Sequence, residues 1–410
     1  MRNRVVITGA GYVTPLGSTP KEITNTVRHN TPNFIPFHDF EGCFACPVPD
    51  FSLTASTGRW KNKKYLARGA QFALAAAIRA AENCSLPVEE FAEAGLFTGA
   101  GPNFDISSDF PNIKSGNLDS VELAALWMLR YLPNTAASAI SQFLHIHGDN
   151  STIGTACSAS TQAIGEAFRK IKDGYLIVAF AGGGDSRISH GGLLAYKKAQ
   201  AIWNKGGDPD KACRPFDEKR SGFVAGEGGA MFVLESLEHA QKRGAHILAE
   251  ICGYGATMDA HSMTAPHPEA VHAEKAVRSA LTEANLTPDD IDLISAHGTS
   301  TPLNDRMEAN MIERVFYADT NNKRPYVTAV KSWIGHCTAA SGAVELSILL
   351  ASLSKGVVPP VRNLTTPCSD KINFVTERTD FSGTNMLSTI LLENFGFGGQ
   401  NSALVVRLWS

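Results

Sequence analysis

Short apolar runs rich in β-branched residues alternate along this chain with longer amphipathic stretches. The runs at residues 4–8, 94–98, 176–182 and 229–234 predict strands, and those at 66–82 and 158–172 predict helices. The alternation then continues with strands at 291–295, 326–330, 386–392 and 403–408 and helices at 271–284, 306–315 and 339–353. Strands that alternate with helices are typical of an α/β fold, in which a parallel sheet carries helices on its faces.

The alternation begins again after residues 247–252, so the pattern predicts two halves, residues 1–250 and 251–410. A faint repetition supports this division, because Gly154 to Ser160 and Gly335 to Ser341 each place glycine and small residues before a helix. No Pro/Ser-rich linker separates the halves. We therefore expect one rigid unit.

Composition and charge narrow the classes of protein. The chain has 410 residues, 43% of them hydrophobic and 19% charged, and a formal net charge of −3, which argues against a nucleic-acid binder. No apolar run approaches the roughly 20 residues that span a bilayer. The N-terminal residues lead directly into a strand without a signal-peptide core, and the eight cysteines have no regular spacing. We expect a cytoplasmic protein without membrane insertion.

The candidate chemistry centres on one cysteine and two histidines. Cys157 stands where a predicted strand ends and a helix begins, a position at which the peptide dipoles favour thiolate over thiol. His297 and His336 each stand at a predicted junction beside a glycine. A nucleophile with two imidazoles on tight turns is suited to acyl-transfer chemistry.

Two other patterns carry weaker signals. Gly9-Ala-Gly11 follows a strand, as in dinucleotide-binding folds, but Pro15 interrupts the helix that such a site needs. The histidines between residues 258 and 274 lack cysteine or carboxylate partners at a familiar metal-ligand spacing, so we interpret them as a solvated loop and expect no metal site.

Four motifs resemble one family in their order along the chain. They are Gly-Thr-Ala-Cys157-Ser, Ala-His297-Gly-Thr-Ser-Thr, the Lys331 to Gly-His336 segment, and Phe395-Gly-Phe397-Gly-Gly. Together with the opening and closing segments they make the chain similar to β-ketoacyl-acyl carrier protein synthases, most of all the type II elongating enzymes, over almost its whole length. The resemblance implies a thiolase-like fold of five layers, α-β-α-β-α, built from two related halves. It also implies 3-oxoacyl-[acyl-carrier-protein] synthesis in fatty acid elongation, with no cofactor apart from the carrier's phosphopantetheine.

The resemblance assigns catalytic roles to particular residues. Cys157 is the expected nucleophile, and His297 and His336 are expected to donate hydrogen bonds to the malonyl thioester. Lys331 is expected to pair with Glu308 and so to hold the histidine loops. The oxyanion hole is expected to consist of the backbone N–H groups of Cys157 and Phe397.

Substrate and carrier sites are implied in the same way. Phe397 is expected to gate the acyl pocket, Thr299 and Thr301 to bind the pantetheine arm, and Phe104 and Leu193 to line the acyl tunnel. The acidic acyl carrier protein is the expected partner, and the lysines expected to dock it are Lys63, Lys64 and Lys197.

Three alternatives stay open. A ketosynthase of a type II polyketide or aryl-polyene pathway would use the same chemistry, and Pro102-Asn103-Phe104 and Glu393-Asn394 depart from the fatty acid pattern. A catalytically silent chain-length factor would lack the cysteine, so Cys157 argues against it. A degradative thiolase would show a Cys-His-Cys set instead. The sequence leaves open whether the dimer is a homodimer or a heterodimer with a chain-length factor.

Overall fold

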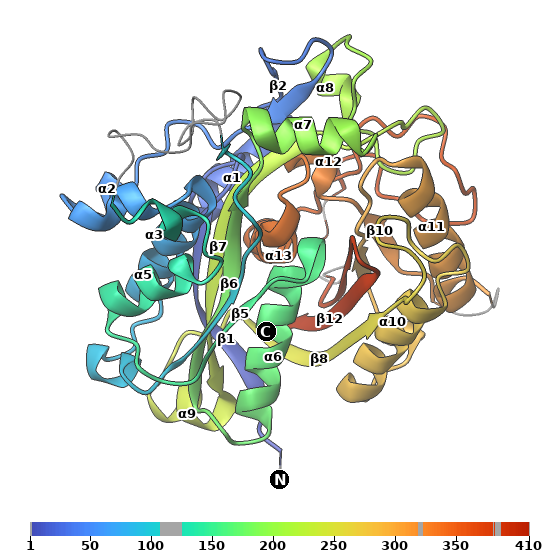
Figure 1. Cartoon of the computed structure of the whole chain (residues 1–410). Coiled ribbons are helices and arrows are strands. Elements are labelled where there is room, and N and C mark those ends of the chain that lie inside the picture. The colour runs from blue at the N-terminus through green and yellow to red at the C-terminus, as the bar shows by residue number, and fades with distance from the viewer. Residues whose placement is uncertain (1, 107–124, 319–322, 380, 382–386, 410) are drawn as a thin grey trace.

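One mixed sheet runs through the molecule (Figure 1). The computed structural model describes residues 2–106, 125–318, 323–379, 381 and 387–409. In this part of the chain the sheet has 12 strands, and its main path has the order β10-β9-β11-β12-β8-β1-β7-β6-β4-β5. Both halves of the sequence therefore contribute strands to a single framework.

The first half contains β1 to β7 and the helices between them. Its strands are β1 (Val5–Val13), β2 (Ile35–Pro36), β3 (Phe44–Cys46), β4 (Gly95–Gly99), β5 (Asn150–Ile153), β6 (Val178–Ser186) and β7 (Ala225–Ser236). Its α-helices are α1 (Pro20–His29), α2 (Thr54–Thr57), α3 (Arg68–Asn83), α5 (Thr135–Leu144), α6 (Ala159–Lys172), α7 (His190–Lys198), α8 (Pro209–Ala212) and α9 (Leu237–Lys242). Short 3₁₀ helices are η1 (Lys61–Tyr65), η2 (Val88–Phe91), η4 (Trp127–Arg130) and η5 (Ala156–Ser158).

The second half also alternates strands with helices. Its strands are β8 (Ala249–Met258), β9 (Leu293–Ser295), β10 (Tyr326–Thr328), β11 (Thr389–Gly396) and β12 (Gln400–Leu408). Its helices are α10 (Val271–Ala284), α11 (Pro302–Phe316), α12 (Lys331–Ile334) and α13 (Ser341–Leu353), with the 3₁₀ turns η6 (Pro288–Asp290) and η7 (Thr338–Ala340).

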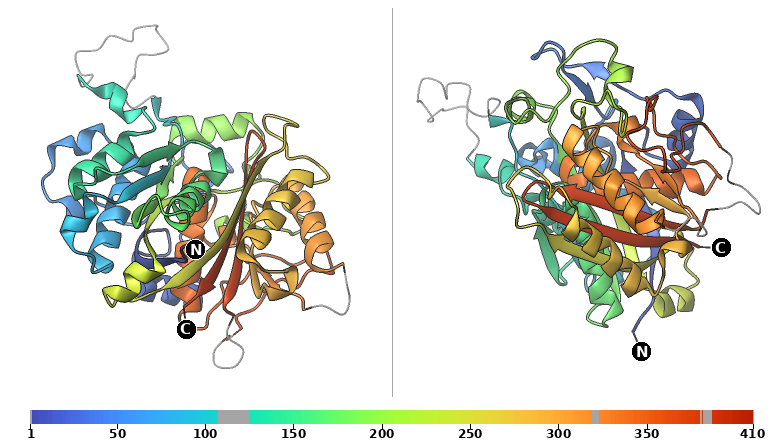
Figure 2. Two further views of the ribbon diagram at one scale, coloured as in Figure 1. Left: turned by 90° about the horizontal axis from the view of Figure 1, so that it is seen from below. Right: turned by 90° about the vertical axis from the view of Figure 1, so that its right-hand side faces the viewer.

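The elements stack in five layers, which confirms the predicted α-β-α-β-α fold. Helices α3 and α5 cover the outer face of the first half's strands, and α10 and α11 cover the outer face of the second half's strands (Figures 1 and 2). Helices α6 and α13 pack against each other between the two sets of strands. The central helices carry long apolar faces, and α13 is buried throughout. The functional residues at the ends of these central elements therefore lie deep in the molecule.

The two sets of strands have matching order about their junction. Reading outward from the junction, one set runs β1, β7, β6, β4, β5 and the other runs β8, β12, β11, β9, β10. They join through a short antiparallel pairing in which residues 5–7 of β1 face residues 249–251 of β8. The predicted division at residue 250 falls at the start of β8, and it stays a prediction.

Glycines explain why one predicted strand was too short. The predicted strand at 229–234 extends over Ala225–Ser236, and its first part is rich in glycine, which weakens a strand pattern. A Cβ at Gly229 would lie 2.9 Å from the backbone carbon of Phe72, so these glycines allow α3 to approach the sheet. The predicted strand at 386–392 runs over Thr389–Gly396, and Met386 lies outside the described residues.

No helix in the described part of the chain has the length and apolar character needed to cross a bilayer. Among the same residues, no group of three or more histidine, cysteine, aspartate or glutamate side chains is arranged to hold a metal ion. Rings of His261, His267 and His272 are neighbours, with centroids 5.0 Å and 6.4 Å apart. The cytoplasmic location stays a prediction.

Candidate active site

Cys157 lies on a tight turn between β5 and α6. It belongs to the short 3₁₀ segment η5, and the preceding Ala156 has a left-handed φ of 49°. A non-glycine residue in this region is strained by about 1 kcal/mol or more. The turn also packs closely on the β11–β12 connection, because a Cβ at Gly396 would lie 2.9 Å from the Cys157 nitrogen. The predicted junction is therefore confirmed, and the turn holds the thiol beside residues of the second half.

His336 lies against the Cys157 thiol. Its Nε2 is 3.1 Å from Cys157 Sγ, and its Nδ1 is 3.0 Å from Ser341 Oγ. The backbone N–H of Thr338 donates to the same Nδ1 at 3.3 Å. Since a backbone N–H can only donate, Nδ1 is the acceptor nitrogen, and the proton of the neutral ring is on Nε2. His336 therefore aims an N–H donor at the sulfur.

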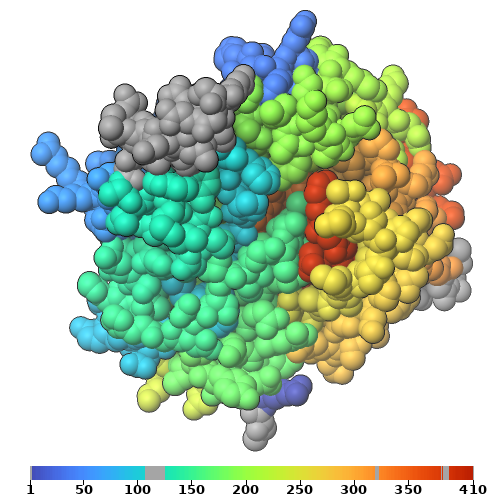
Figure 3. Space-filling model, viewed as in Figure 1, coloured from blue at the N-terminus to red at the C-terminus, as the bar shows by residue number. Residues whose placement is uncertain are grey.

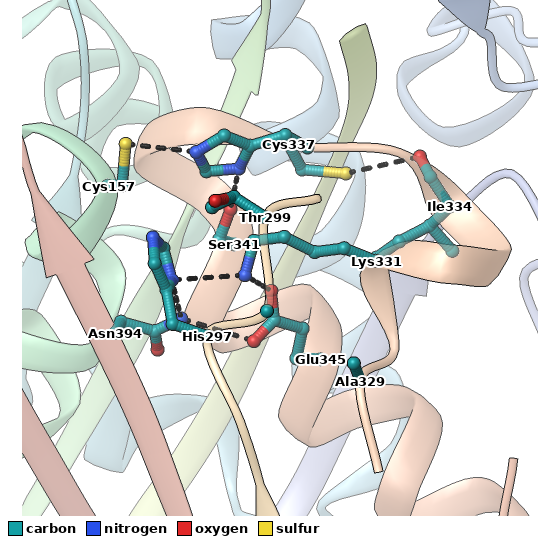
Figure 4. Close-up of polar contacts among 12 residues, drawn as sticks. Cys157, His297, Thr299, Ala329, Lys331, Ile334, Cys337, Ser341, Glu345 and Asn394 are labelled. Atoms are coloured by element: carbon teal, nitrogen blue, oxygen red, sulfur yellow. Dashed lines mark hydrogen bonds and ion pairs between the residues drawn. The ribbon is translucent and has the colours of Figure 1, made fainter. Parts of the chain in front are cut away.

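His297 has the same tautomer for a different reason. Its Nδ1 accepts from Lys331 Nζ at 3.1 Å and faces the Asn394 amide nitrogen at 3.4 Å (Figure 4). An ammonium has only donors, so Nδ1 again lacks a proton and Nε2 carries it. The rings of His297 and His336 are 5.5 Å apart. The two histidines thus present two N–H donors to the same small region.

Burial keeps both imidazoles neutral. The pKa of His297 is held well below its usual value by desolvation, then by the positive charge of Lys331 and by His336. The pKa of His336 is lowered by the same desolvation and by Lys331. Neutral rings of this tautomer can stabilise a negatively charged oxygen by hydrogen bonding without protonating it.

The partner of Lys331 differs from the prediction. Lys331 Nζ lies 2.5 Å from Glu345 Oε1, in the middle of α13, so the expected pairing with Glu308 is wrong (Figure 4). The geometry gives the reason: Glu308 Oε1 and Oε2 already accept the backbone N–H groups of His297 and Gly298, at 2.5 Å and 2.8 Å. Both carboxylates therefore hold His297, one through its backbone and the other through Lys331.

Asn394 joins these groups into one network. Its amide nitrogen donates to Glu345 Oε2 at 3.1 Å, and its Oδ1 accepts from Thr161 Oγ1 at 2.5 Å. Because Asn394 is on β11 and Thr161 is on α6, the network fastens the His297 side to the helix that follows Cys157. The departure at Glu393-Asn394 thus places an amide where it can orient His297.

Glu393 faces Glu308 in a fully buried position. Neither carboxylate oxygen of Glu393 has a hydrogen-bond partner apart from the carboxyl contact with Glu308. Desolvation and then the charge of Glu308 raise the pKa of Glu393 well above its usual value. Desolvation also raises the pKa of Glu308, to about 7, although the Gly298 N–H opposes this. We infer that the pair holds one proton, which lets Glu393 donate an O–H to Glu308.

Replacing Glu393 by glutamine should make the protein more resistant to alkaline pH. The unfolded chain releases the proton near the ordinary glutamate value of about 4.3, whereas the folded pair retains it. The free energy of unfolding of the native protein therefore falls as the pH rises from about 4.3 through the raised pKa values of Glu393 and Glu308. Glutamine keeps a donor for Glu308 and has no proton to lose.

Melting temperatures measured from pH 5 to pH 9 check this expectation. The difference between Glu393→Gln and the unchanged protein should grow in favour of the variant as pH rises. Glu89→Gln, at an exposed position, is the control and should show no such trend. A constant difference across the pH range would contradict the shared proton.

Burial also changes the expectation for Cys157. Desolvation raises the pKa of its thiol to about 11, although the Lys331 charge and the Phe397 N–H act in the opposite direction. Desolvation therefore outweighs the influences that favour the thiolate in the enzyme without substrate. The thiolate is the charged form that the neighbouring donors must stabilise when it reacts.

The loop at residues 395–399 covers Cys157 and reaches the surface. Phe397 is 39% exposed, and its backbone N–H faces the Cys157 sulfur. Gly398 N–H donates to Met263 O at 2.8 Å, so the loop is tied to the segment after β8. In Figure 3 this β11–β12 turn (red) lies at the surface beside a hollow between the two halves. A glycine on each side of Phe397 suits a loop that moves.

The other predicted substrate residues lie around this centre. Thr299 and Thr301 follow His297, with their hydroxyl oxygens 2.8 Å apart. Leu193 is fully buried in a cluster with Phe223, whose ring lies 5.1 Å from that of His336. Phe104 is half-buried and stacks under the Arg187 guanidinium, 4.9 Å from its carbon. Their roles stay predictions.

Sequence reasoning missed Glu345, Ser341, Asp185 and Arg187. Glu345 had a visible signal, since it is the one charged residue in the apolar stretch 341–353. A lone glutamate in such a helix is buried only when its carboxylate has an ionic or hydrogen-bonding partner. The other three have no comparable pattern, because only the folded chain brings them near Cys157.

These features define a class of protein: a condensing enzyme of thiolase-like fold with a Cys-His-His site. Residues 2–240 match the N-terminal domain of β-ketoacyl synthases, and residues 248–365 match the C-terminal domain. The chain therefore belongs to the β-ketoacyl synthase family, whose members are acyltransferases.

Similar proteins cover the whole chain. It is 32% identical to 3-oxoacyl-[acyl-carrier-protein] synthase 2 of a Synechocystis strain, over 99% of this chain and 98% of that protein. It is 30% identical to the protein of the same name from Vibrio harveyi, over 99% of both. Among solved structures, a β-ketoacyl synthase from Burkholderia phymatum has a TM-score of 0.89 at 29% identity, and the ishigamide ketosynthase/chain length factor has 0.88 at 28%, each over 100% of both chains.

Proposed function

We propose that this protein is a 3-oxoacyl-[acyl-carrier-protein] synthase that extends an acyl chain by two carbons through decarboxylative condensation. The observation that carries the proposal is the placement of two neutral histidines, each with its proton on Nε2, beside a thiol. His336 Nε2 lies 3.1 Å from Cys157 Sγ, and the His297 ring is 5.5 Å from that of His336. This arrangement provides a nucleophile and two donors for one developing negative charge.

In the first half-reaction an acyl group moves to Cys157. The sulfur attacks the thioester carbonyl of the acyl carrier, and the thiol proton passes to the departing pantetheine thiolate as the old C–S bond breaks. The N–H groups of Cys157 and Phe397 stabilise the oxyanion. The close packing of Gly396 on the Cys157 nitrogen supports this, because it holds the two N–H groups on neighbouring segments.

In the second half-reaction malonyl carrier loses carbon dioxide. The bond to the carboxylate breaks, and its electron pair forms an enolate whose oxygen accepts from Nε2 of His297 and of His336. Each aimed donor contributes about 3 kcal/mol on the scale of a single oxyanion-hole group. The enolate carbon then attacks the Cys157 thioester and the C–S bond breaks, which leaves the product on the carrier and a thiolate at Cys157. This thiolate takes a proton from water to restore the resting thiol. The two half-reactions balance with two carrier-bound substrates and one proton from water.

The pantetheine arm is held by Thr299 and Thr301 in this proposal, and Phe397 opens the way to the thiol. The two hydroxyls lie together next to His297, where the arm must pass to bring a thioester to both histidines. Tyr196 supports the gate, since its ring is 6.4 Å from that of Phe397.

A reconstituted assay tests the function. The purified protein, supplied with acyl carrier and malonyl carrier, should release carbon dioxide and form the 3-oxoacyl product, detected by mass spectrometry of the carrier. His336→Ala should still accept an acyl group on Cys157 but should release carbon dioxide about a hundredfold more slowly. Product formation by His336→Ala at the unchanged rate would contradict the assigned role.

Carrier docking is proposed for Lys63, Lys64 and Lys197. Lys63 and Lys64 belong to η1, and Lys197 is on α7, next to the residue that contacts the Phe397 gate. Charge reversal at all three should raise the KM for the acidic carrier several-fold at low salt, and added salt should narrow the difference. Reversal of Lys242, which is exposed on α9, is the control. An unchanged KM in the triple variant would remove these lysines from the interface.

We also propose a dimer that forms through β5. In the described part of the chain β5 pairs with β4 alone, and its other edge has no strand partner. An unpaired edge with half-exposed residues is suited to pairing with a second chain. Sedimentation of the purified chain distinguishes a homodimer from a monomer that needs a ketosynthase-like partner, as a polyketide enzyme would.

A further inference from the structure

A surface groove lies between several segments that are distant in the sequence. It is lined by the end of α1, by α8 and Arg214, by Trp333 of α12, by the segment 360–365 and by residues 376 and 378. Its volume is about 520 Å³, which is within the range of small-molecule sites. The residues that line it do not include Cys157, His297 or His336, so the groove is separate from the candidate active site.

Positive charge is concentrated in this groove. The basic residues that line it are Arg28, Lys211, Arg214, Arg362 and Arg378, and no acidic residue of the described chain lines it. The whole protein has a formal net charge of −3, so the groove is opposite in sign to the protein as a whole. A concave surface of one sign concentrates ligands of the opposite charge.

A second groove, between α6 and α10, differs in this respect. It is larger, about 1030 Å³, and is also rich in basic residues. There, however, acidic side chains compensate the positive charge. Glu274 pairs with both Arg278 and Arg314, and Glu283 pairs with Lys172. The second groove therefore has no comparable need for an anionic ligand.

Three of the five cations in the first groove lack partners. Within the described residues, the side chains of Arg28, Lys211 and Arg378 make no hydrogen bond or ion pair, and all three are exposed. Arg214, by contrast, is bound to the Lys211 carbonyl and to Asp217. Like charges in one groove repel one another, and an anion bound between them offsets that repulsion. The three side chains are therefore available to a ligand.

Arg362 provides a more rigid donor. Its Nε donates to Asn30 Oδ1 at 2.9 Å, and its Nη1 donates to Ser332 O at 3.3 Å, which orients the guanidinium. Its ion-pair partner among the described residues, Asp210 Oδ1, lies 3.9 Å from Nη2, too far for a hydrogen bond. Desolvation lowers the pKa of Arg362 from its usual value, and Asp210 opposes this only in part. The groove thus holds a partly desolvated cation whose charge is incompletely compensated.

We propose that this groove binds a small molecule that carries two or more phosphate groups. The four donors are Arg28, Lys211, Arg362 and Arg378, which come from separate segments, so one ligand needs several anionic groups to meet them. Phosphate suits arginine in particular, because the planar guanidinium donates two parallel N–H bonds to it. The site goes beyond the proposed condensation and does not depend on it.

Calorimetric titration of the full-length protein tests the proposal. Tripolyphosphate and ATP are the probes, each in magnesium-free buffer at about 0.15 M salt, where exposed charges are already screened beyond about 8 Å. Sulfate is the control for a single anion, and adenosine is the control for the base and sugar. At least one probe should bind with a Kd of about 0.1 mM or tighter, and both controls should bind at least about tenfold more weakly.

Removal of charge locates the binding. The triple variant Arg28→Ser, Lys211→Ser and Arg378→Ser should weaken binding of the probe about tenfold or more, because it removes three donors. Condensation should be unchanged, since none of the three residues belongs to the candidate active site. The control variant carries the same loss of charge at exposed residues that do not line the groove, with Arg59→Ser, Lys198→Ser and Lys242→Ser. Its Kd for the probe should equal that of the unchanged protein.

Weakened binding in the first triple variant alone supports the proposal. If neither probe binds at about 0.1 mM, or if both triple variants weaken binding equally, the proposal is overturned. If a polyglutamate peptide binds more tightly than both probes, the proposal is also overturned, and the groove is assigned to an acidic protein segment. The titration involves no acyl transfer, so its failure is distinguishable from failure of the proposed function.

Discussion

Cys157→Ala should form no acyl adduct, and condensation should fall by about a thousandfold or more, because the covalent intermediate has lost its sulfur. The fold should survive, since alanine occupies nearly the same space and the change removes one partly buried atom. Decarboxylation of malonyl carrier should continue, because His297 and His336 keep their tautomers through Lys331 and Thr338.

Intact-protein mass spectrometry, carbon dioxide release and a melting curve check the three parts of this expectation. Cys252→Ala is the matched control, because Cys252 is also a partly buried free cysteine. It should load an acyl group at the unchanged rate. An acyl adduct on the Cys157→Ala protein would show that another residue is the nucleophile.

Glu345→Leu should destabilise the protein by about 3–5 kcal/mol, the effect of leaving one member of a buried ion pair without its partner. Lys331 is 1% exposed, and without Glu345 its ammonium keeps, among the described residues, only the His297 nitrogen as a close acceptor. Glu89→Leu, at an exposed position, should change the free energy of unfolding by no more than about 0.5 kcal/mol.

A double variant separates the structural role of the pair from its catalytic role. Lys331→Met with Glu345→Leu removes both charges, so much of the lost stability should return. Decarboxylation should stay low, because His297 has then lost the Lys331 donor that fixes its tautomer. Urea unfolding and carbon dioxide release measure the two effects. Recovery of both the stability and the rate of decarboxylation would mean that Lys331 has no part in the chemistry.

Local pattern predicted most of the framework, because strand and helix periodicity depend on neighbours in the sequence. The helix predicted at 158–172 and the one predicted at 271–284 match α6 and α10 within one residue. The pattern failed at β7, where the glycines that let α3 approach look like a break in the strand. It gave no sign of α7, whose nine residues include two glycines near its start.

The sequence by itself determined the class of fold and indicated three candidate reactive side chains, since Cys157, His297 and His336 are each recognisable from residues within a few positions of them. The tertiary structure decided the partners and the protonation states of those side chains. Because α13 lies beside α12, Lys331 pairs with Glu345, whereas Glu308 binds the backbone N–H of His297. Burial decided that the cysteine rests as a thiol and that the histidines are neutral, because desolvation depends on every layer that surrounds a group.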